Sequence, residues 1–208
     1  MVITAINPDK KHLVKIEFQD GRECLLDREV CINHALCTEM ELTVEELKEL
    51  KAESDYERAK SRALWYLDRG DYTEKAMYQK LLCAGFSQKA SAKVLSKLCE
   101  LGLIDDRRFA ERFFERCIEH NISKREALHK MLEKGVPYDL AKEMLENGEA
   151  DEETQIKNLL CGKYASKLNA ENGKQKVFAA LARKGFSFSA IRSAMNNYFD
   201  DLEFCEEY

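Results

Sequence analysis

The segment KLLCAGF at residues 80–86 returns as KMLEKGV at residues 130–136 and as ALARKGF at residues 180–186. Each copy carries a glycine at the same position, namely Gly85, Gly135 and Gly185. Internal similarity at a fixed period of about 50 residues is typical of helical repeat architectures. The chain beyond its N-terminal quarter is therefore interpreted as three copies of one structural unit.

Apolar residues at helical spacing precede each of these glycines. In the first copy they are Met77, Tyr78, Leu81 and Leu82, and the matching positions of the other two copies are apolar as well. Residues with this spacing share one face of a helix, which predicts that they form a core. The glycine is expected just past the C-terminus of that helix, where a left-handed backbone is needed.

Helix start signals recur at matching places. The expected N-caps of the middle helices are Thr73, Ser123 and Gly173. Glu126 completes a capping-box pattern with Ser123. Ser87 and Ser187 are expected to cap the third helices, and Pro137 is placed in a first turn. The predicted helices lie at about residues 55–69, 74–84 and 88–101, at 106–120, 124–134 and 137–146, and at 152–168, 173–184 and 188–199.

The N-terminal quarter follows a different pattern. Short apolar runs at residues 3–6, 13–18 and 23–26 predict β-strands. Asp20-Gly21 lies between the last two and is a strong hairpin signal. This part is therefore expected to form a small β-rich cap.

A charged segment connects the cap to the repeats. Thr43 and Glu46 form a capping box that begins a short helix. A second, charged helix is expected around residues 52–60. The predicted fold is mainly α-helical, with three tandem three-helix repeats behind the cap. The predicted segments are a cap at 1–50, repeats at 51–104 and 105–148, and a third repeat with an acidic tail at 149–208.

Positive charge is concentrated in the third repeat, although the whole chain has a net charge of −5. Residues 157–199 contain one acidic residue, Glu171, and eight cations: Lys157, Lys163, Lys167, Lys174, Lys176, Arg183, Lys184 and Arg192. Cations without nearby acidic partners repel one another, and a polyanion or an acidic protein surface would relieve that repulsion. The sequence favours a binding surface here. No base-reading motif accompanies it, so contact with DNA would be to phosphates.

A second row of cations lies in the second repeat. Arg107, Arg108, Arg112 and Arg116 fall near one helical face, and glutamates accompany them. Such a mixed row is most often a solvated face held by i,i+4 ion pairs. The four arginines remain candidates for partner or DNA binding, and the solvated face is the favoured interpretation.

Catalytic signatures are absent from the sequence. It has no HExxH, no phosphate-binding glycine loop and no GxSxG, and its four histidines are dispersed. Asp105 and Asp106 precede a helix, where carboxylates favour its positive end. Eight cysteines without a CxxC pair predict free thiols in a reducing cytosol and no metal site. We expect no catalytic residue, no cofactor and no membrane segment.

Three stretches of the chain resemble the RecX family. They are LGLIDDRRFAERF at residues 101–113, ALWYLDRGDYTE at residues 63–74 and LEKGV at residues 132–136. The β-rich cap is similar to that of RecX proteins from low-GC Gram-positive bacteria. One departure is Asn121-Ile122-Ser123, where the family usually has a glycine. Because asparagine tolerates the left-handed conformation, the turn is expected to survive.

The resemblance implies a function as well as a fold. It implies an elongated, curved array of repeats that binds in the groove of the RecA filament on single-stranded DNA. There it modulates, mostly by inhibition, filament assembly, ATPase and strand exchange. We also expect a non-enzymatic, cytoplasmic monomer. The setting would be DNA repair, homologous recombination and the SOS response. Two alternatives stay open: a helical module that binds the phosphates of single- or double-stranded DNA, and a helical scaffold for another protein.

Overall fold

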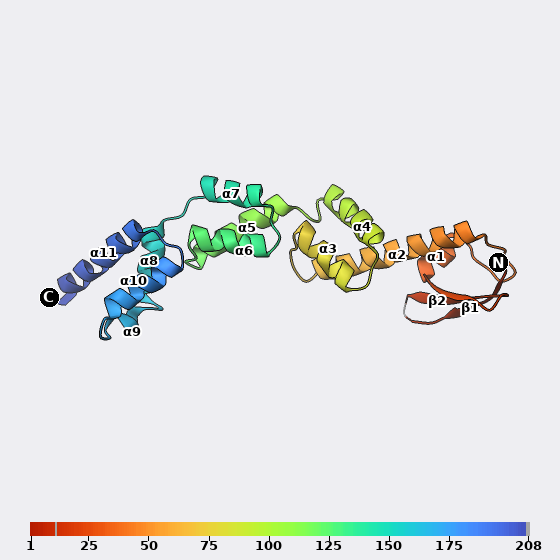
Figure 1. The fold of residues 1–208 in the computed structure, drawn as a ribbon, viewed down its shortest axis with the longest axis horizontal. Helices are drawn as coiled ribbons and strands as arrows, with labels where there is room; N and C mark the ends of the chain where they lie inside the picture. Colours follow the sequence, from red (N-terminus) through yellow and green to blue (C-terminus); the bar gives the residue numbers. More distant parts are fainter. Residues whose placement is uncertain (11, 207–208) are drawn as a thin grey trace. The chain divides into compact units, whose positions relative to one another are not determined.

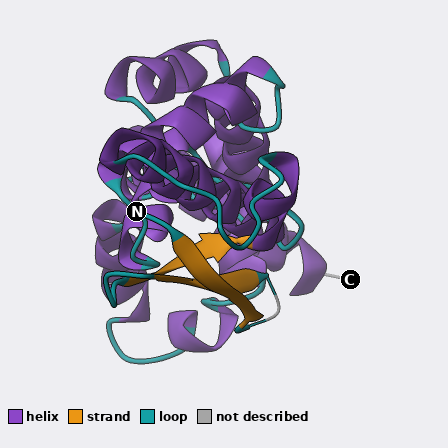
Figure 2. Cartoon of the chain, turned by 90° about the vertical axis from the view of Figure 1, so that its right-hand side faces the viewer, coloured by secondary structure: helices purple, strands orange, loops and turns teal. Residues whose placement is uncertain are grey.

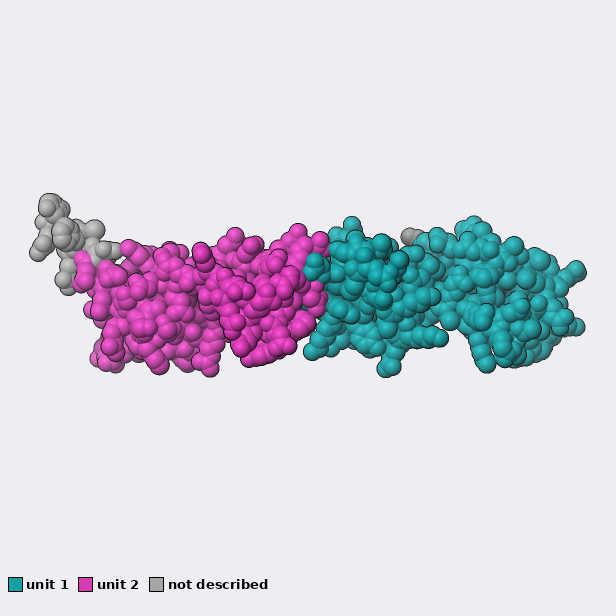
Figure 3. Space-filling model, turned by 90° about the horizontal axis from the view of Figure 1, so that it is seen from above, with its two compact units in different colours: residues 1–105 teal, residues 106–208 magenta. Residues whose placement is uncertain are grey.

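The computed structural model describes the backbone of residues 1–10 and 12–206, and the side chains of residues 1–10 and 12–200. The chain divides into two compact units, Met1–Asp105 and Asp106–Tyr208, which Figure 3 colours separately. Figure 2 shows helices in purple and the N-terminal sheet in orange. The predicted class, mainly helical with a small β-rich cap, is confirmed.

Three antiparallel strands in the order β1-β2-β3 form the sheet of the cap: β1 (Ile3–Pro8), β2 (Leu13–Phe18) and β3 (Glu23–Asp27). Val14, Ile16 and Phe18 alternate into the core, as a half-buried strand requires. The predicted hairpin is present, and Gly21 has a φ of 79° within it. A short helix, α1 (Arg28–Asn33), follows the sheet directly. It was not predicted, because it is too short to show a periodic pattern.

A single long helix, α2 (Val44–Leu67), connects the cap to the first repeat (Figure 1). The sequence predicted separate helices here, but no helix breaker stands between them. The capping box of Thr43 and Glu46 is confirmed. Leu47 and Leu50 of α2 belong to the core of the cap, whereas Ala59 and Ala63 belong to the core of the first repeat. The predicted boundary at residue 50 lies inside this helix.

The remaining helices follow the predicted triplets closely. The first repeat adds α3 (Glu74–Cys83) and α4 (Gln88–Glu100) to α2. The second contains α5 (Asp106–Glu119), α6 (Lys124–Glu133) and α7 (Tyr138–Asn147). The third contains α8 (Glu152–Cys161), α9 (Ala165–Leu168), α10 (Gly173–Arg183) and α11 (Phe188–Glu206). Each triplet encloses its own hydrophobic core of described residues.

Two helices of the third repeat differ from the prediction. The helix expected over residues 152–168 is divided into α8 and α9, because the backbone leaves the helical conformation at Gly162. The last helix was expected to end near residue 199, but α11 continues to Glu206, so the backbone of most of the acidic tail is helical. The side chains of that tail, including the thiol of Cys205, lie outside the described residues.

The three equally spaced glycines end their helices as predicted. Gly85, Gly135 and Gly185 have φ values of 91°, 92° and 92°. In the first repeat the amide of Phe86 donates to the carbonyl of Leu81, and the same bond recurs in the other two. These are Schellman caps, in which the glycine takes the left-handed position. Asn121 ends α5 in the same way with a φ of 52°, so the predicted survival of that turn is confirmed.

Two of the predicted caps are displaced by one residue, and one pair forms only in part. Asn172 is the N-cap of α10, and Gly173 is its first residue; a Cβ on Gly173 would lie 2.3 Å from the carbonyl oxygen of Lys167. Pro137 is the N-cap of α7 instead of a first-turn residue. Ser123 accepts from the amide of Glu126, but that carboxylate contacts two lysines, so the reciprocal bond is replaced.

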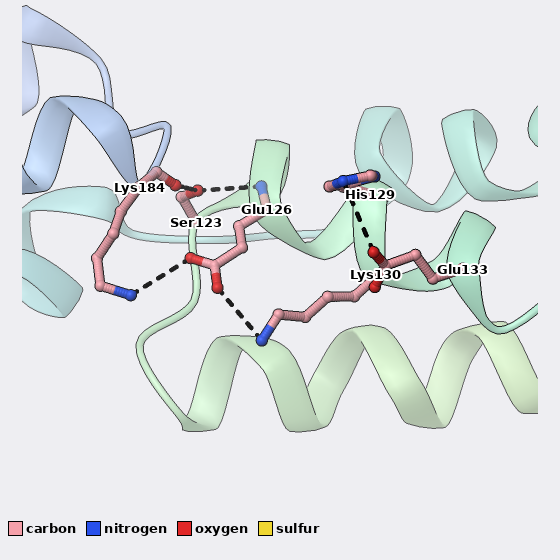
Figure 4. Close-up of polar contacts among 6 residues, drawn as sticks. All are labelled: Ser123, Glu126, His129, Lys130, Glu133 and Lys184. Carbon is pink, nitrogen blue, oxygen red and sulfur yellow. Dashed lines mark hydrogen bonds and ion pairs between the residues drawn. The ribbon is translucent and has the colours of Figure 1, made fainter.

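Polar contacts join the second and third repeats inside the second unit. The Ser123 hydroxyl donates to the carbonyl of Lys184 at 2.5 Å, and the Lys184 ammonium lies 3.4 Å from the Glu126 carboxylate (Figure 4). The side-chain amide of Gln155 donates to the carbonyls of Ile118 and Ile122 at 3.2 Å each. The last carbonyl groups of a helix have no hydrogen-bond donor within that helix. The bonds from Gln155 therefore supply donors to carbonyl groups at and just beyond the end of α5.

Candidate functional site

The positive end of α10 carries the first cations of the candidate site. Its first turn contains Lys174 and Lys176 and no acidic residue. By contrast, Glu74 and Glu126 occupy the first turns of α3 and α6. Cations at a helix N-terminus oppose the helix dipole by about 0.3–1 kcal/mol each at an exposed position. The lysines therefore weaken the helix that carries them, which favours a role in binding.

A groove between α10 and α11 brings two of the predicted cations together with aromatic rings. Its volume is about 410 Å3, and the residues that line it are Lys174, Gln175, Phe178, Arg192, Met195, Asn196 and Phe199. The Lys174 ammonium lies 3.5 Å from the centre of the Phe199 ring. Lys174 and Arg192 are exposed, whereas Met195 is buried. We name this feature the basic groove.

Phe188 extends the apolar surface beside the basic groove. Its ring stacks on that of Phe178, with ring centres 5.9 Å apart and planes 9° from parallel. Phe188 is nonetheless 67% exposed. Aromatic residues and arginine are enriched at the centres of protein interfaces. Sequence reasoning missed the aromatic part of the groove, although a phenylalanine directly after the N-cap Ser187 was a usable signal.

The other predicted cations of the third repeat do not line the groove. Lys157, Lys163 and Lys167 are exposed on or near α8 and α9. The Lys176 ammonium donates to the carbonyl of Glu171 at 3.2 Å, and the Arg183 guanidinium donates to the carbonyl of Ala179 at 3.3 Å. The basic surface is therefore broader than the groove.

Lys184 corrects one sequence-based expectation. It was expected to lack an acidic partner, but the fold brings Glu126 of the second repeat to 3.4 Å from its ammonium. Burial would raise the pKa of Glu126, yet Lys130 and Lys184 outweigh it and lower that pKa below its ordinary value. Glu126 is shared between Lys130 and Lys184, so it compensates the charge of Lys184 only in part, and Lys184 stays a candidate for the binding surface.

The arginine row of α5 has a different environment. Arg107 forms a bidentate pair with Glu143 of α7, with both distances at 2.9 Å, and its hydrogen bonds lower the pKa of that carboxyl. A hollow of about 630 Å3 beside Arg107 is lined largely by glutamates, including Glu111 and Glu115. Arg108, Arg112 and Arg116 are exposed along the same helix. The fold pairs Arg107 with Glu143, and all four arginines stay candidates for binding.

Other kinds of site find no support in the described part of the chain. Among its residues, no cluster of three or more His, Cys, Asp or Glu side chains could hold a metal ion. The seven cysteines with described side chains are free thiols. None of the described helices is long and apolar enough to span a membrane.

The three-helix repeats define the class of this chain as a helical repeat protein. The family model for the first three-helix domain of RecX matches residues 59–98, and the model for the third three-helix domain of RecX matches residues 151–195. Over most of its length the chain is similar to regulatory proteins of the RecX family.

Curated relatives extend this similarity over most of the chain, and solved structures share its fold. The regulatory protein RecX of Clostridium tetani is 28% identical over 201 residues, which are 93% of each chain. That of Streptococcus mutans is 26% identical, over 95% of this chain and 77% of its own. A crystal structure of regulatory protein RecX shares the fold with a TM-score of 0.69 and 22% identity, covering 94% of this chain and 98% of the other. The crystal structure of RecX from Lactobacillus salivarius has a TM-score of 0.59 and a sequence identity of 21%. The match covers 69% of this chain and 96% of the other.

Proposed function

We propose that this protein regulates the bacterial recombinase RecA by binding the filament that RecA forms on single-stranded DNA. Binding mostly inhibits filament assembly, ATP hydrolysis and strand exchange. Similarity to regulatory proteins over most of the chain supports this proposal. The observation that carries it is the basic groove, which lies in the region matching the third three-helix domain of RecX.

The chemistry of the groove suits an acidic partner surface. Lys174 and Arg192 supply positive charge at the rim, and the rings of Phe178 and Phe199 supply an apolar floor. Charge complementarity steers the encounter, and aromatic and arginine anchors slow dissociation. On this proposal the protein acts by binding alone, as a monomer in the cytoplasm, with no reaction or cofactor of its own.

The decisive experiment measures the ATPase activity of RecA on single-stranded DNA as this protein is added. We expect the parent protein to lower the rate in a saturable manner and to hydrolyse no ATP itself. For the double variant Lys174→Glu/Arg192→Glu, the concentration that gives the same inhibition should be at least about tenfold higher. Each charge reversal replaces attraction to an acidic partner by repulsion.

A matched control separates the groove from net charge. Lys48→Glu/Lys51→Glu reverses two exposed cations on α2 of the first unit, which is the same change in net charge, and should inhibit like the parent. If saturating parent protein leaves both the ATPase and strand exchange unchanged, the proposed function is wrong. If all variants inhibit equally, the protein regulates RecA through another surface.

A second candidate function is direct binding to DNA phosphates by the third repeat. The cation-rich stretch at residues 157–199, with Glu171 as its one acidic residue, favours it. Binding to phosphates weakens steeply with salt, with a logarithmic slope of about 0.7–0.9 per neutralised phosphate. A salt titration of DNA binding, compared with one of RecA binding, distinguishes the two functions.

A further inference from the structure

Aromatic and basic side chains form a continuous cluster in the first repeat, remote in sequence from the basic groove. Trp65 of α2 carries the Arg69 guanidinium 3.7 Å and the Arg62 guanidinium 5.4 Å from its ring centre. Tyr66 meets Trp65 edge-on at 5.3 Å and Tyr72 at 6.2 Å between ring centres. Lys80 of α3 lies over both tyrosines at 4.9 and 5.0 Å. We name these six residues the aromatic–basic cluster.

Packing of the repeat explains the rings of Tyr66 and Tyr72, which lie against its core, but not the exposed ring of Trp65. Trp65 is 45% exposed, and neighbouring Leu64 is exposed as well. The residues that stand 50 and 100 positions later are Glu115 and Ala165, and neither belongs to the hydrophobic core of its repeat. A tryptophan is thus not needed for the fold at this position, and exposing it sacrifices apolar burial.

The charge around the cluster favours a polyanion. Residues 58–80 contain six Lys or Arg and three acidic residues, within a chain whose net charge is −5. Asp68 lies 3.6 Å from Arg69, but both side chains are at least half exposed. Surface ion pairs of this kind are worth about 0–1 kcal/mol, so a phosphate can compete for the arginine.

We propose that the aromatic–basic cluster binds single-stranded nucleic acid, with bases stacked on Trp65 and phosphates held by Arg62, Arg69 and Lys80. Rings bordered by cations are the combination that binds single strands without base-specific contacts. Guanidinium planes also stack on bases, so Arg62 and Arg69 can contact either part of a nucleotide. This inference does not depend on regulation of RecA.

Trp65 makes the test local, because it is the chain's one tryptophan. Oligothymidine added to the full-length protein should quench its fluorescence. An abasic oligonucleotide of equal length keeps the phosphates but has no bases, so it should bind more weakly and leave the fluorescence nearly unchanged. These two probes separate stacking from charge attraction.

Variants extend the test with fluorescence anisotropy of a labelled oligothymidine. Trp65→Leu should raise Kd about tenfold, a typical effect of losing one stacked base. Trp65→Phe keeps a ring and should stay within about threefold of the parent. Arg62→Gln and Arg69→Gln should each lower the logarithmic salt slope by about 0.7. Lys48→Gln is the matched control and should change nothing.

Three outcomes would overturn the inference. The first is an unchanged Trp65 fluorescence at oligothymidine concentrations that saturate the anisotropy signal, which would place binding elsewhere. The second is a Trp65→Leu variant that binds as tightly as the parent while its circular dichroism shows a native fold. The third is quenching by a glutamate-rich peptide but not by oligothymidine, which would make the partner a protein.

Discussion

At the scale of single residues, Gly85 and Gly185 have the same left-handed backbone but different surroundings. A Cβ on Gly85 would meet no atom within 4 Å. A Cβ on Gly185 would lie 2.9 Å from the Cβ of Arg125 and 3.0 Å from the Ser123 hydroxyl. The second glycine therefore serves its own helix and the contact between two repeats.

We expect Gly185→Ala to destabilise the protein more than Gly85→Ala. Both substitutions place a side chain in the left-handed region, which costs roughly 1–2 kcal/mol. Gly185→Ala must also displace Arg125 or Ser123, which adds about 1–3 kcal/mol. Urea unfolding followed by circular dichroism measures both changes, with Gly85→Ala as the control. Equal losses would show that the repeats adjust freely at this contact.

The sequence predicted these residues unevenly. The left-handed glycines were predictable because each ends an apolar stripe, which is a local pattern. The neighbour of Gly185 was not predictable, because Arg125 lies 60 positions away in the chain. For the same reason Gly173 was predicted as an N-cap, although it is the first residue of its helix. A glycine is required there because a Cβ would collide with the carbonyl oxygen of Lys167, which the sequence pattern does not show.

At the scale of elements, α6 and α10 are joined by an ion pair whose strength depends on pH. The pKa of Glu126 is lowered from its ordinary value of 4.5 in the folded protein. A carboxyl group with a lowered pKa stabilises the fold above its ordinary pKa, and this contribution is lost as the pH falls through the folded value. The contact of Glu126 with Lys184 should therefore weaken under acidic conditions.

We expect Glu126→Gln to lower the melting temperature at pH 7 and to have little effect well below pH 4.5. The loss at neutral pH should be at most about 1 kcal/mol, since the pair is partly exposed. Glu133→Gln is a matched control on the same helix, because Glu133 contacts exposed His129 at 3.7 Å (Figure 4). A constant difference between parent and Glu126→Gln across the pH range would contradict this assignment.

Element boundaries were predictable where the signal is local. Caps at Thr73, Ser87 and Ser187 were found because one side chain and an amide three residues later define them. The pairing of Ser123 with Glu126 was predicted as a full capping box, but Lys184 competes for the carboxylate from 58 residues away. The candidate site was predicted by charge alone. Its grouping into a groove depends on how α11 packs on α10, which periodicity does not show.

At the scale of the molecule, each of the two units contains complete hydrophobic cores. The cap and first repeat enclose theirs within residues 1–105, and the second and third repeats enclose theirs within residues 106–208. We expect the fragments 1–105 and 106–208 to fold separately, with helical circular dichroism spectra and cooperative melting. Fragment 1–86 lacks α4 and its core residues Val94 and Leu98, so it should lose cooperative melting of the first repeat.

The helix α2 fixes the angular position of the cap on the first repeat. One side of its N-terminal half faces the sheet through Leu47 and Leu50, and its later turns face α3 and α4 through Ala59 and Ala63. Each residue inserted between these pairs would turn the sheet by about 100° around the helix axis and move it by about 1.5 Å. Insertions of seven residues nearly restore the original orientation, whereas insertions of two point the sheet almost backwards. The length of this helix is therefore as constrained as its composition.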